Sequence, residues 1–240
     1  MGYILGVAIT GTENLDTSLV VTEGYGNIKM SERTFNLLKS HDGKFVSKNA
    51  IKGGASQLGV ATLQEGIKLR SFGINVPILV LGNLYTKKDL LICFRNDLMP
   101  TVSNIRECLI CNNIGKSNNL KFSLHLKVDT GMSRLGFDCD QFVQQFNNIK
   151  SLENIAVKGI YSHLACADED NALNPKSSTQ IQRRKLQELL KLINLDKKHN
   201  VKIHLANSAG MFLGKDFHFD MVRVGLSMYC LLYTSDAADE

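Results

Sequence analysis

Short apolar segments alternate with longer segments of helical periodicity from about residue 57 to residue 224. The apolar segments are rich in Val, Ile and Leu and predict strands. The segments between them repeat apolar residues at helical spacing and predict helices. The predicted strands are 57–61, 78–81, 99–102, 124–128, 156–163, 203–206 and 221–224. The predicted helices are 64–72, 87–93, 103–112, 140–146, 180–193 and 209–213.

This alternation predicts an α/β fold with a parallel sheet and helices outside it. Seven strands are visible, and an eighth would close a (β/α)₈ barrel of the TIM type. The first strand of that barrel is in doubt. A doubly wound open sheet is the structural alternative, but no GxGxxG sequence follows the first visible strand.

The two ends of the chain do not continue the alternation. Residues 1–46 contain glycine, serine and acidic residues without clear elements, and Val20 and Val21 are the candidates for a strand there. We therefore divide the chain into an unmatched N-terminal segment, 1–46, a barrel, 47–229, and a tail, 230–240.

Composition narrows the possible functions. A chain of 240 residues with 44% hydrophobic residues can bury one large core. The net charge of +5 suits an anionic small ligand but is more often only a property of the surface. No long basic run with interleaved aromatic residues is present, so we expect no nucleic-acid partner. No apolar stretch is long enough to span a membrane.

The N-terminus lacks the basic region of a signal peptide, so we expect a cytoplasmic protein with reduced thiols at its six cysteines. Cys108 and Cys111 form a lone CxxC in a helical segment. A redox or zinc role for this pair is the less favoured interpretation, because zinc needs a second pair of ligands and no strand leads into the motif. We predict no metal site.

The segment 127–137, KVDTGMSRLGF, has the most unusual pattern of charge. It overlaps a strand in which Leu124, Leu126 and Val128 face one side, while three ionisable residues face the other. Ionisable side chains on a buried strand need partners. The segment therefore predicts a site at the end of a strand; its ionisable residues are His125, Lys127 and Asp129, with Arg134 in the following loop.

Polar residues also follow three other predicted strands. In a barrel the carboxyl ends of all strands meet at one face, which holds the active site. Each residue alone has an ordinary structural explanation, and the argument depends on their convergence. The residues at these three strand ends are His163, Asn207, Ser208, Arg223 and Gly225.

The last two of these strand ends predict a phosphorylated ligand. The loops after strands seven and eight are the usual phosphate site of such barrels. Ser208 offers a hydroxyl, Ala209 and Gly210 offer amides at a helix start, and Gly225 allows close approach of the backbone to an anion.

Four segments in this order, KVDTGMSRLGF, GIYSHLACADE, HLANSAG and DMVRVGLSMY, resemble the alanine racemases. The similarity runs from about Lys48 to Tyr229. The family's enzymes use pyridoxal 5′-phosphate (PLP) in a barrel domain that is followed by a β-domain. The resemblance implies interconversion of L- and D-alanine by a cytoplasmic homodimer that supplies D-alanine for peptidoglycan.

The resemblance also implies roles for the cofactor-binding residues. Arg223 would contact the pyridine nitrogen and keep it unprotonated. Ser208, Gly225 and Leu226 would hold the phosphate, with Asn207 beside it.

Three further residues would support catalysis. His163 would pack against the cofactor ring and link to Arg223. Arg134 would bond the phenolic oxygen of the cofactor or the carboxylate of the substrate. Lys127 would match a lysine that is carbamylated in many members and orients the arginine.

The chain departs from the family at both proton-moving bases. One is a lysine in a VKANAYGHG-like motif on the first strand, where it binds PLP covalently. That motif would fall near Phe35, but the local sequence is SERTFNLLKSHDGK, and the nearest echo, VVTEGYGN at residues 20–27, contains no lysine. Nothing marks Lys39, Lys44 or Lys48 as a replacement.

The second base is a tyrosine from the β-domain of the partner subunit, a domain that we expect to be missing here. The final segment, CLLYTSDAADE, resembles a translated sequencing adapter, and we expect both ends of the chain to be non-native. We accordingly predict little or no racemase activity for this chain. Two alternatives stay open: a racemase of serine or another small amino acid, and a PLP-binding fragment without catalysis.

Overall fold

The computed structural model describes residues 4–10, 43–168, 174–195 and 200–225. Eight strands form a ring in the order β4-β3-β2-β1-β9-β8-β7-β5, which the pairing of β4 with β5 closes. The strands are β1 (Ile4–Thr10), β2 (Gln57–Val60), β3 (Ile78–Asn83), β4 (Met99–Val102), β5 (Phe122–Asp129), β7 (Ile155–Tyr161), β8 (Lys202–His204) and β9 (Met221–Val224). The two-residue strand β6 (Phe137–Asp138) pairs with β5 outside the ring.

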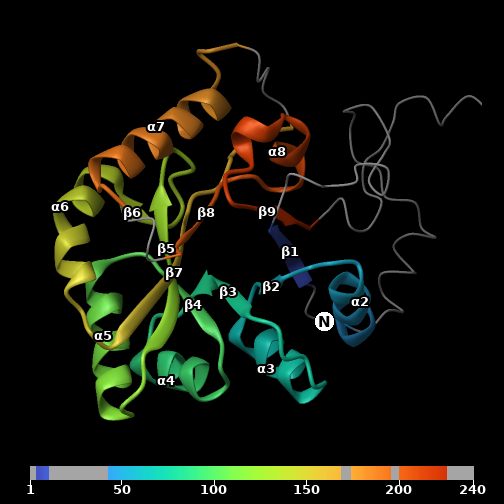
Figure 1. Cartoon of the computed structure of the whole chain (residues 1–240), viewed down its shortest axis with the longest axis vertical. Helices are drawn as coiled ribbons and strands as arrows, with labels where there is room; N and C mark the ends of the chain where they lie inside the picture. Colours follow the sequence, from blue (N-terminus) through green and yellow to red (C-terminus); the bar gives the residue numbers. More distant parts are fainter. Residues whose placement is uncertain (1–3, 11–42, 169–173, 196–199, 226–240) are drawn as a thin grey trace, which may run out of the picture.

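The helices lie outside this ring of strands (Figure 1). They are α2 (Gly43–Lys52), α3 (Leu63–Ser71), α4 (Lys87–Arg95), α5 (Ile105–Ser117), α6 (Cys139–Lys150), α7 (Ser178–Leu192), α8 (Ser208–Phe212) and the short 3₁₀ helix η4 (Lys215–Phe217). The predicted barrel and its outer layer of helices are thus confirmed, and the closed ring rules out the doubly wound alternative.

Every predicted strand and helix is present, with ends that differ by a few residues. The sequence interpretation missed β1, β6, α2 and η4. The candidate strand at Val20 and Val21 lies outside the described residues.

The missed strand β1 closes the barrel in the opposite direction to the others. Pairs between neighbouring strands from β2 through β9 are parallel, whereas β1 pairs antiparallel with both β2 and β9. Val7 lies opposite Leu58 on one side and Val224 on the other. An antiparallel strand satisfies the backbone groups of two open strand edges as well as a parallel strand does. The direction of the first strand therefore departs from a regular (β/α)₈ barrel.

Two apolar clusters divide the core. The larger one fills the layer between strands and helices and includes Leu124, Leu126 and Val128. A smaller one, made by Leu79, Met99 and Tyr161 with Leu81 packed against it, is separate from that layer. The predicted alternation along β5 is confirmed, since its three apolar residues all belong to the outer layer.

Capping residues fix where the helices begin. Thr62 accepts a hydrogen bond from the amide of Glu65, whose carboxylate in turn accepts from the Thr62 amide, so α3 starts with a capping box. Thr86, Asn104 and Ser177 cap α4, α5 and α7 in the same manner through one side-chain acceptor each.

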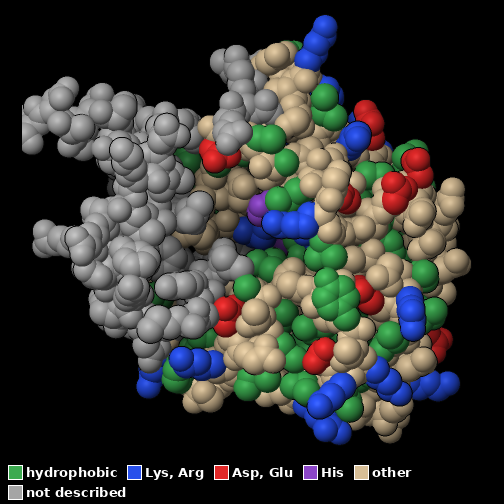
Figure 2. Space-filling model, turned by 180° about the vertical axis from the view of Figure 1, so that it is seen from behind, with side chains coloured by type: hydrophobic (Ala, Val, Ile, Leu, Met, Phe, Trp, Pro, Cys, Tyr) green, Lys and Arg blue, Asp and Glu red, His purple; other side chains and the backbone are tan. Residues whose placement is uncertain are grey.

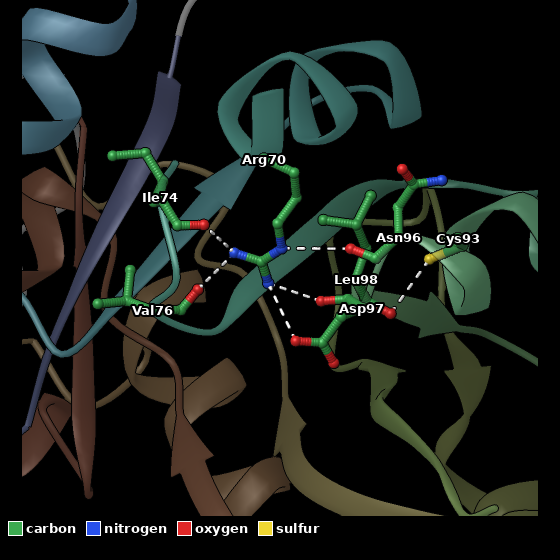
Figure 3. Close-up of polar contacts among 7 residues, drawn as sticks. All are labelled: Arg70, Ile74, Val76, Cys93, Asn96, Asp97 and Leu98. Atoms are coloured by element: carbon green, nitrogen blue, oxygen red, sulfur yellow. Dashed lines mark hydrogen bonds and ion pairs between the residues drawn. The ribbon is translucent and has the colours of Figure 1, made fainter. Parts of the chain in front are cut away.

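Arg70, near the end of α3, joins the loops that follow α3 and α4 (Figure 3). Its guanidinium donates to the carbonyls of Ile74, Val76, Asn96 and Asp97 at 2.6–3.2 Å. The carboxylate of Asp97 lies 3.7 Å away and is 99% exposed, so this ion pair contributes little. The carbonyl contacts are therefore the stabilising part of this cluster.

The CxxC motif belongs to the core. Cys108 and Cys111 are fully buried on α5, and burial raises the pKa of the Cys108 thiol to about 12. Such a thiol is a poor nucleophile near neutral pH. No group of three metal-ligating side chains occurs among the described residues. Within the same residues, no helix is both long and apolar enough to cross a membrane.

Candidate active site

A pocket of about 610 Å³ opens where the parallel strands end. Figure 2 shows basic and histidine side chains together in a hollow of the molecular surface. The lining residues are Ala61, Leu81, Gly82, Asn83, Tyr85, Lys127, Arg134, Leu135, Tyr161, His163, Asp168, Asn207, Ser208, Ala209, Arg223 and Gly225. The four polar strand ends identified in the sequence therefore converge on one cavity.

Arg223, on β9, is held rigidly beside this pocket. Its guanidinium donates to the carbonyls of Ser162 and Leu205 at 2.8 and 2.9 Å and to Nδ1 of His204 at 2.8 Å. It also lies 3.3 Å from Nδ1 of His163. Burial lowers the pKa of Arg223 to about 10, so the side chain stays protonated near neutral pH. The pocket is thus provided with a fixed cation.

A chain of two histidines continues from Arg223 into the barrel. Arginine can only donate, so Nδ1 of His204 is the acceptor and its Nε2–H donates to Nδ1 of His125 at 3.0 Å. Burial lowers the pKa of His125 to about 3 and that of His204 well below its usual value, with Arg223 adding to both effects. Both rings are therefore neutral, and their tautomers follow from the arginine.

Tyr161 supports the same chain from β7. Its ring stacks on His204 with centroids 4.6 Å apart, and its hydroxyl lies 2.8 Å from Oγ1 of Thr101. The Arg223 guanidinium carbon lies 5.1 Å from the centre of this ring. Packing from three strands thus fixes the orientation of Arg223.

His163 follows β7 directly and faces Arg223, as the resemblance implies. Burial, Arg223, Lys127 and Arg134 together lower the pKa of His163 to about 3. A neutral ring at this position can accept from Arg223 and present its face to a planar ligand.

Gln182 holds the backbone of this strand end, and the sequence interpretation missed it. Its amide nitrogen donates to the carbonyl of His163 at 2.8 Å, and its amide oxygen accepts from the amide of Ala165 at 2.9 Å. It is 1% exposed and lies on the buried face of α7 with Thr179 and Leu186. The sequence signal that could have identified Gln182 is a polar residue on the apolar face of α7.

Lys127 and Arg134 enter the pocket from β5 and its following loop. Lys127 is 5% exposed, and its pKa falls to about 8 because of burial and the nearby charges of Arg134 and Arg223. No hydrogen bond joins Lys127 to Arg134 within the described residues, and two cations repel one another. The predicted orienting role of Lys127 stays a prediction.

Asp129 shapes the loop that carries Arg134. Its carboxylate accepts from the amides of Gly131 and Ser133 at 2.8 and 3.1 Å. Gly136 has φ of +139°, and a Cβ there would lie 2.6 Å from the Asp129 amide nitrogen. The loop therefore requires glycine at residue 136.

Asn207, Ser208 and Gly225 meet at the predicted phosphate site. The hydroxyl of Ser208 accepts from the Gly225 amide at 3.0 Å, which brings the loops after β8 and β9 together. The Gly210 amide donates to the side chain of Asn207 at 2.9 Å. Asn207 thus caps α8 and engages the Gly210 amide, and the offer of that amide to a phosphate stays a prediction. Leu226 lies outside the described residues.

No lysine occupies the first strand of the ring. The sequence of β1 is ILGVAIT. Lys44 and Lys48 are exposed on α2, where the Lys44 amine lies 5.6 Å from the centre of the Phe72 ring. Lys39 lies outside the described residues. Among those that are described, Lys127 is the one lysine that lines the pocket.

Comparisons with known proteins give one consistent family. The model of "Alanine racemase, N-terminal domain" matches residues 37–232. An alanine racemase of Prochlorococcus marinus is 47% identical over 189 residues, which are 79% of this chain and 49% of that protein. One of Synechocystis is 35% identical over 192 residues, 80% of this chain and 50% of that protein. The chain thus spans about half the length of the curated relatives that it matches.

Solved structures agree with this result. An alanine racemase of Clostridium difficile has a TM-score of 0.72 and 27% identity, and the match covers 94% of this chain and 58% of that one. An alanine racemase of Bartonella henselae with covalently bound pyridoxal phosphate has a TM-score of 0.65 and 27% identity, over 78% of this chain and 52% of that one.

Proposed function

Because the chain belongs to the alanine racemase family through its N-terminal domain, we propose that its pocket binds PLP. We further propose that it supplies the barrel half of an enzyme that interconverts L- and D-alanine. The observation that carries this proposal is the immobilised Arg223, a permanent hydrogen-bond donor that borders the pocket beside His163.

The residues present fit this cofactor. The pocket volume of about 610 Å³ is in the range of small-molecule sites. Three basic side chains line the pocket and suit an anionic ligand, namely Lys127, Arg134 and Arg223. When bound, PLP withdraws electrons from the α-carbon of an amino acid and so acidifies its proton.

Arg223 sets the electronic state of the bound ring in this proposal. Because it is protonated and held by three acceptors, it can donate towards a pyridine nitrogen but cannot accept a proton from it. Arg223 would thereby keep that nitrogen unprotonated and limit the electron withdrawal that the cofactor supplies. His163 would pack against the ring, and Ser208 with Gly225 would hold the phosphate.

The two proton-moving residues that the family resemblance implies are not identified among the described residues. Racemisation needs a base on each face of the α-carbon. The family resemblance assigns these to a first-strand lysine, which β1 lacks, and to a tyrosine of a partner subunit. We therefore propose that this chain alone has little or no racemase activity. The lysine-free β1 favours the second candidate function, a PLP-binding protein without turnover.

The biological setting follows from the family alone. We propose that the complete enzyme is a cytoplasmic homodimer that provides D-alanine for peptidoglycan, with alanine as its substrate. A racemase of serine or another small amino acid is the alternative for the substrate.

Equilibrium dialysis against PLP tests the binding proposal. We expect the chain to retain PLP, Arg223→Gln to lose most of that binding, and Arg223→Lys to keep a part of it. Arg106→Gln, an exposed change on α5, is the matched control. Equal binding by all four proteins, or none by the unaltered chain, would contradict the proposal.

A further inference from the structure

The pocket contains an amine, that of Lys127, for which no ion pair is found among the described residues. Its Nζ lies 5.8 Å from the centre of the Tyr161 ring, and Arg223 lies 5.1 Å from the centre of that ring. The lysine thus shares its aromatic neighbour with a second cation, and repulsion by Arg223 favours loss of a proton from Nζ.

The strand that closes the barrel offers no competing amine. β1 lies between β2 and β9, and its sequence ILGVAIT contains no lysine. The Bartonella henselae neighbour holds pyridoxal phosphate covalently. A protein attaches an aldehyde covalently through an amine, and lysine supplies it. In the part of this chain that the structure describes, the amine that faces the pocket is that of Lys127.

We propose that Lys127 captures PLP covalently, through a C=N bond between its Nζ and the aldehyde carbon of the cofactor. This inference rests on the proposed function, since it requires PLP in the pocket. The neutral Nζ adds to the aldehyde carbon, and the nitrogen loses two protons in total while the carbonyl oxygen gains two. Departure of that oxygen as water leaves the C=N bond, so the step consumes amine and aldehyde and needs no oxidant or reductant.

The surroundings of Lys127 make this amine available. With a pKa of about 8 in place of 10.5, roughly half of it is neutral at about pH 8, against about 0.3% for an ordinary lysine. The fraction of neutral, reactive amine is therefore roughly 100-fold larger for Lys127 than for an exposed lysine. The charged or titratable groups that face it are Asp129 from β5, Arg134 from the following loop, Tyr161 from β7, His163 after β7 and Arg223 from β9.

Reductive trapping tests the proposal without measuring activity. The full chain is incubated with PLP at about pH 8, treated with borohydride and digested, and the pyridoxyl-lysine is located by mass spectrometry. Borohydride converts a C=N bond into a stable secondary amine. Lys127→Arg keeps the charge and Lys127→Met keeps the length, but neither can form the bond. Lys158→Arg, an exposed change on β7, is the matched control. Equilibrium dialysis before reduction measures total PLP binding for each protein.

The outcomes separate this inference from the proposed function. We expect one adduct, on Lys127, in the unaltered chain and in Lys158→Arg. In both Lys127 variants the amount of adduct should fall by about 100-fold or more, following the difference in neutral amine. PLP retained in dialysis without an adduct on Lys127, or with Lys127 carbamylated, would overturn the inference and leave the binding proposal standing. An adduct on another lysine would also overturn it. Absence of all PLP binding would overturn both.

Discussion

Two buried histidines and the partly buried His163 couple the stability of this barrel to pH. Burial and the charge of Arg223 lower the pKa values of His125 and His163 to about 3, and they lower that of His204 as well. In the unfolded chain these rings take up protons near the ordinary pKa of 6.5, whereas in the folded chain they stay neutral at that pH. The unfolded state therefore binds more protons as the pH falls below 6.5, and the folded state loses relative stability.

The size of this loss follows from the pKa values. Between about pH 7.5 and about pH 5, a ring with a pKa of 6.5 unfolded and about 3 folded costs the fold about 2 kcal/mol. His125 and His163 together account for about 4 kcal/mol, and His204 acts in the same direction. Single domains are commonly stable by about 5–15 kcal/mol, so mild acid is expected to remove a large part of the total.

Urea unfolding followed by circular dichroism at the two pH values measures this effect. The informative variant is His125→Gln, because its amide oxygen can still accept from Nε2–H of His204 but the side chain binds no proton. The His125→Gln variant is expected to be less stable than the unaltered chain at both pH values. Its loss of unfolding free energy between about pH 7.5 and about pH 5 should be smaller than that of the unaltered chain by about 2 kcal/mol.

One result would refute this reasoning. If the unaltered chain and His125→Gln lost the same unfolding free energy between the two pH values, the ring of His125 would not be neutral in the fold. The hydrogen-bond chain from Arg223 through His204 would then need different protonation states from those inferred here.

Four further substitutions test other parts of the structure. Arg70→Lys should lower the unfolding free energy by about 2 kcal/mol, since lysine cannot reach four carbonyls, whereas Asp97→Asn should change it by less than about 0.5 kcal/mol in the same urea titration. Gly159→Ala should destabilise by about 2–3 kcal/mol, because a Cβ there would lie 2.4 Å from Nδ1 of His125, and an unchanged midpoint would contradict that clash. Ser208→Ala removes a hydroxyl at the proposed phosphate site and should weaken PLP binding about 10-fold in equilibrium dialysis, with unaltered affinity as the contrary outcome.

Much of the barrel could be predicted because its signals are local. Each ring strand from β2 to β9 is a short apolar segment, and each helix from α3 to α8 begins at a residue whose side chain caps it. Lys127, His163, Ser208 and Arg223 were found as site residues because each is a polar side chain at or near a strand end. Because the carboxyl ends of barrel strands share one face, these residues were predicted to lie together. The structure shows that all four line one cavity.

Contacts that support the site across long sequence separations escaped prediction. Gln182 reaches the backbone of His163 from a helix nineteen residues further along the chain. His125 and His204 are joined across 79 residues, and the tautomer of each is set by Arg223. No local pattern encodes such pairs, since they exist only once strands from different parts of the sequence lie side by side.

The sequence by itself determined the alternation of strands and helices, the apolar face of β5 and the polar strand ends that form the pocket. Only the tertiary structure decided how the ring closes, with β1 antiparallel between β2 and β9. It also decided the pKa of Lys127, because that value depends on burial and on charges contributed by a loop and another strand. Hydrophobic periodicity is a property of neighbouring residues, whereas strand direction, desolvation and charge proximity are properties of the packed chain.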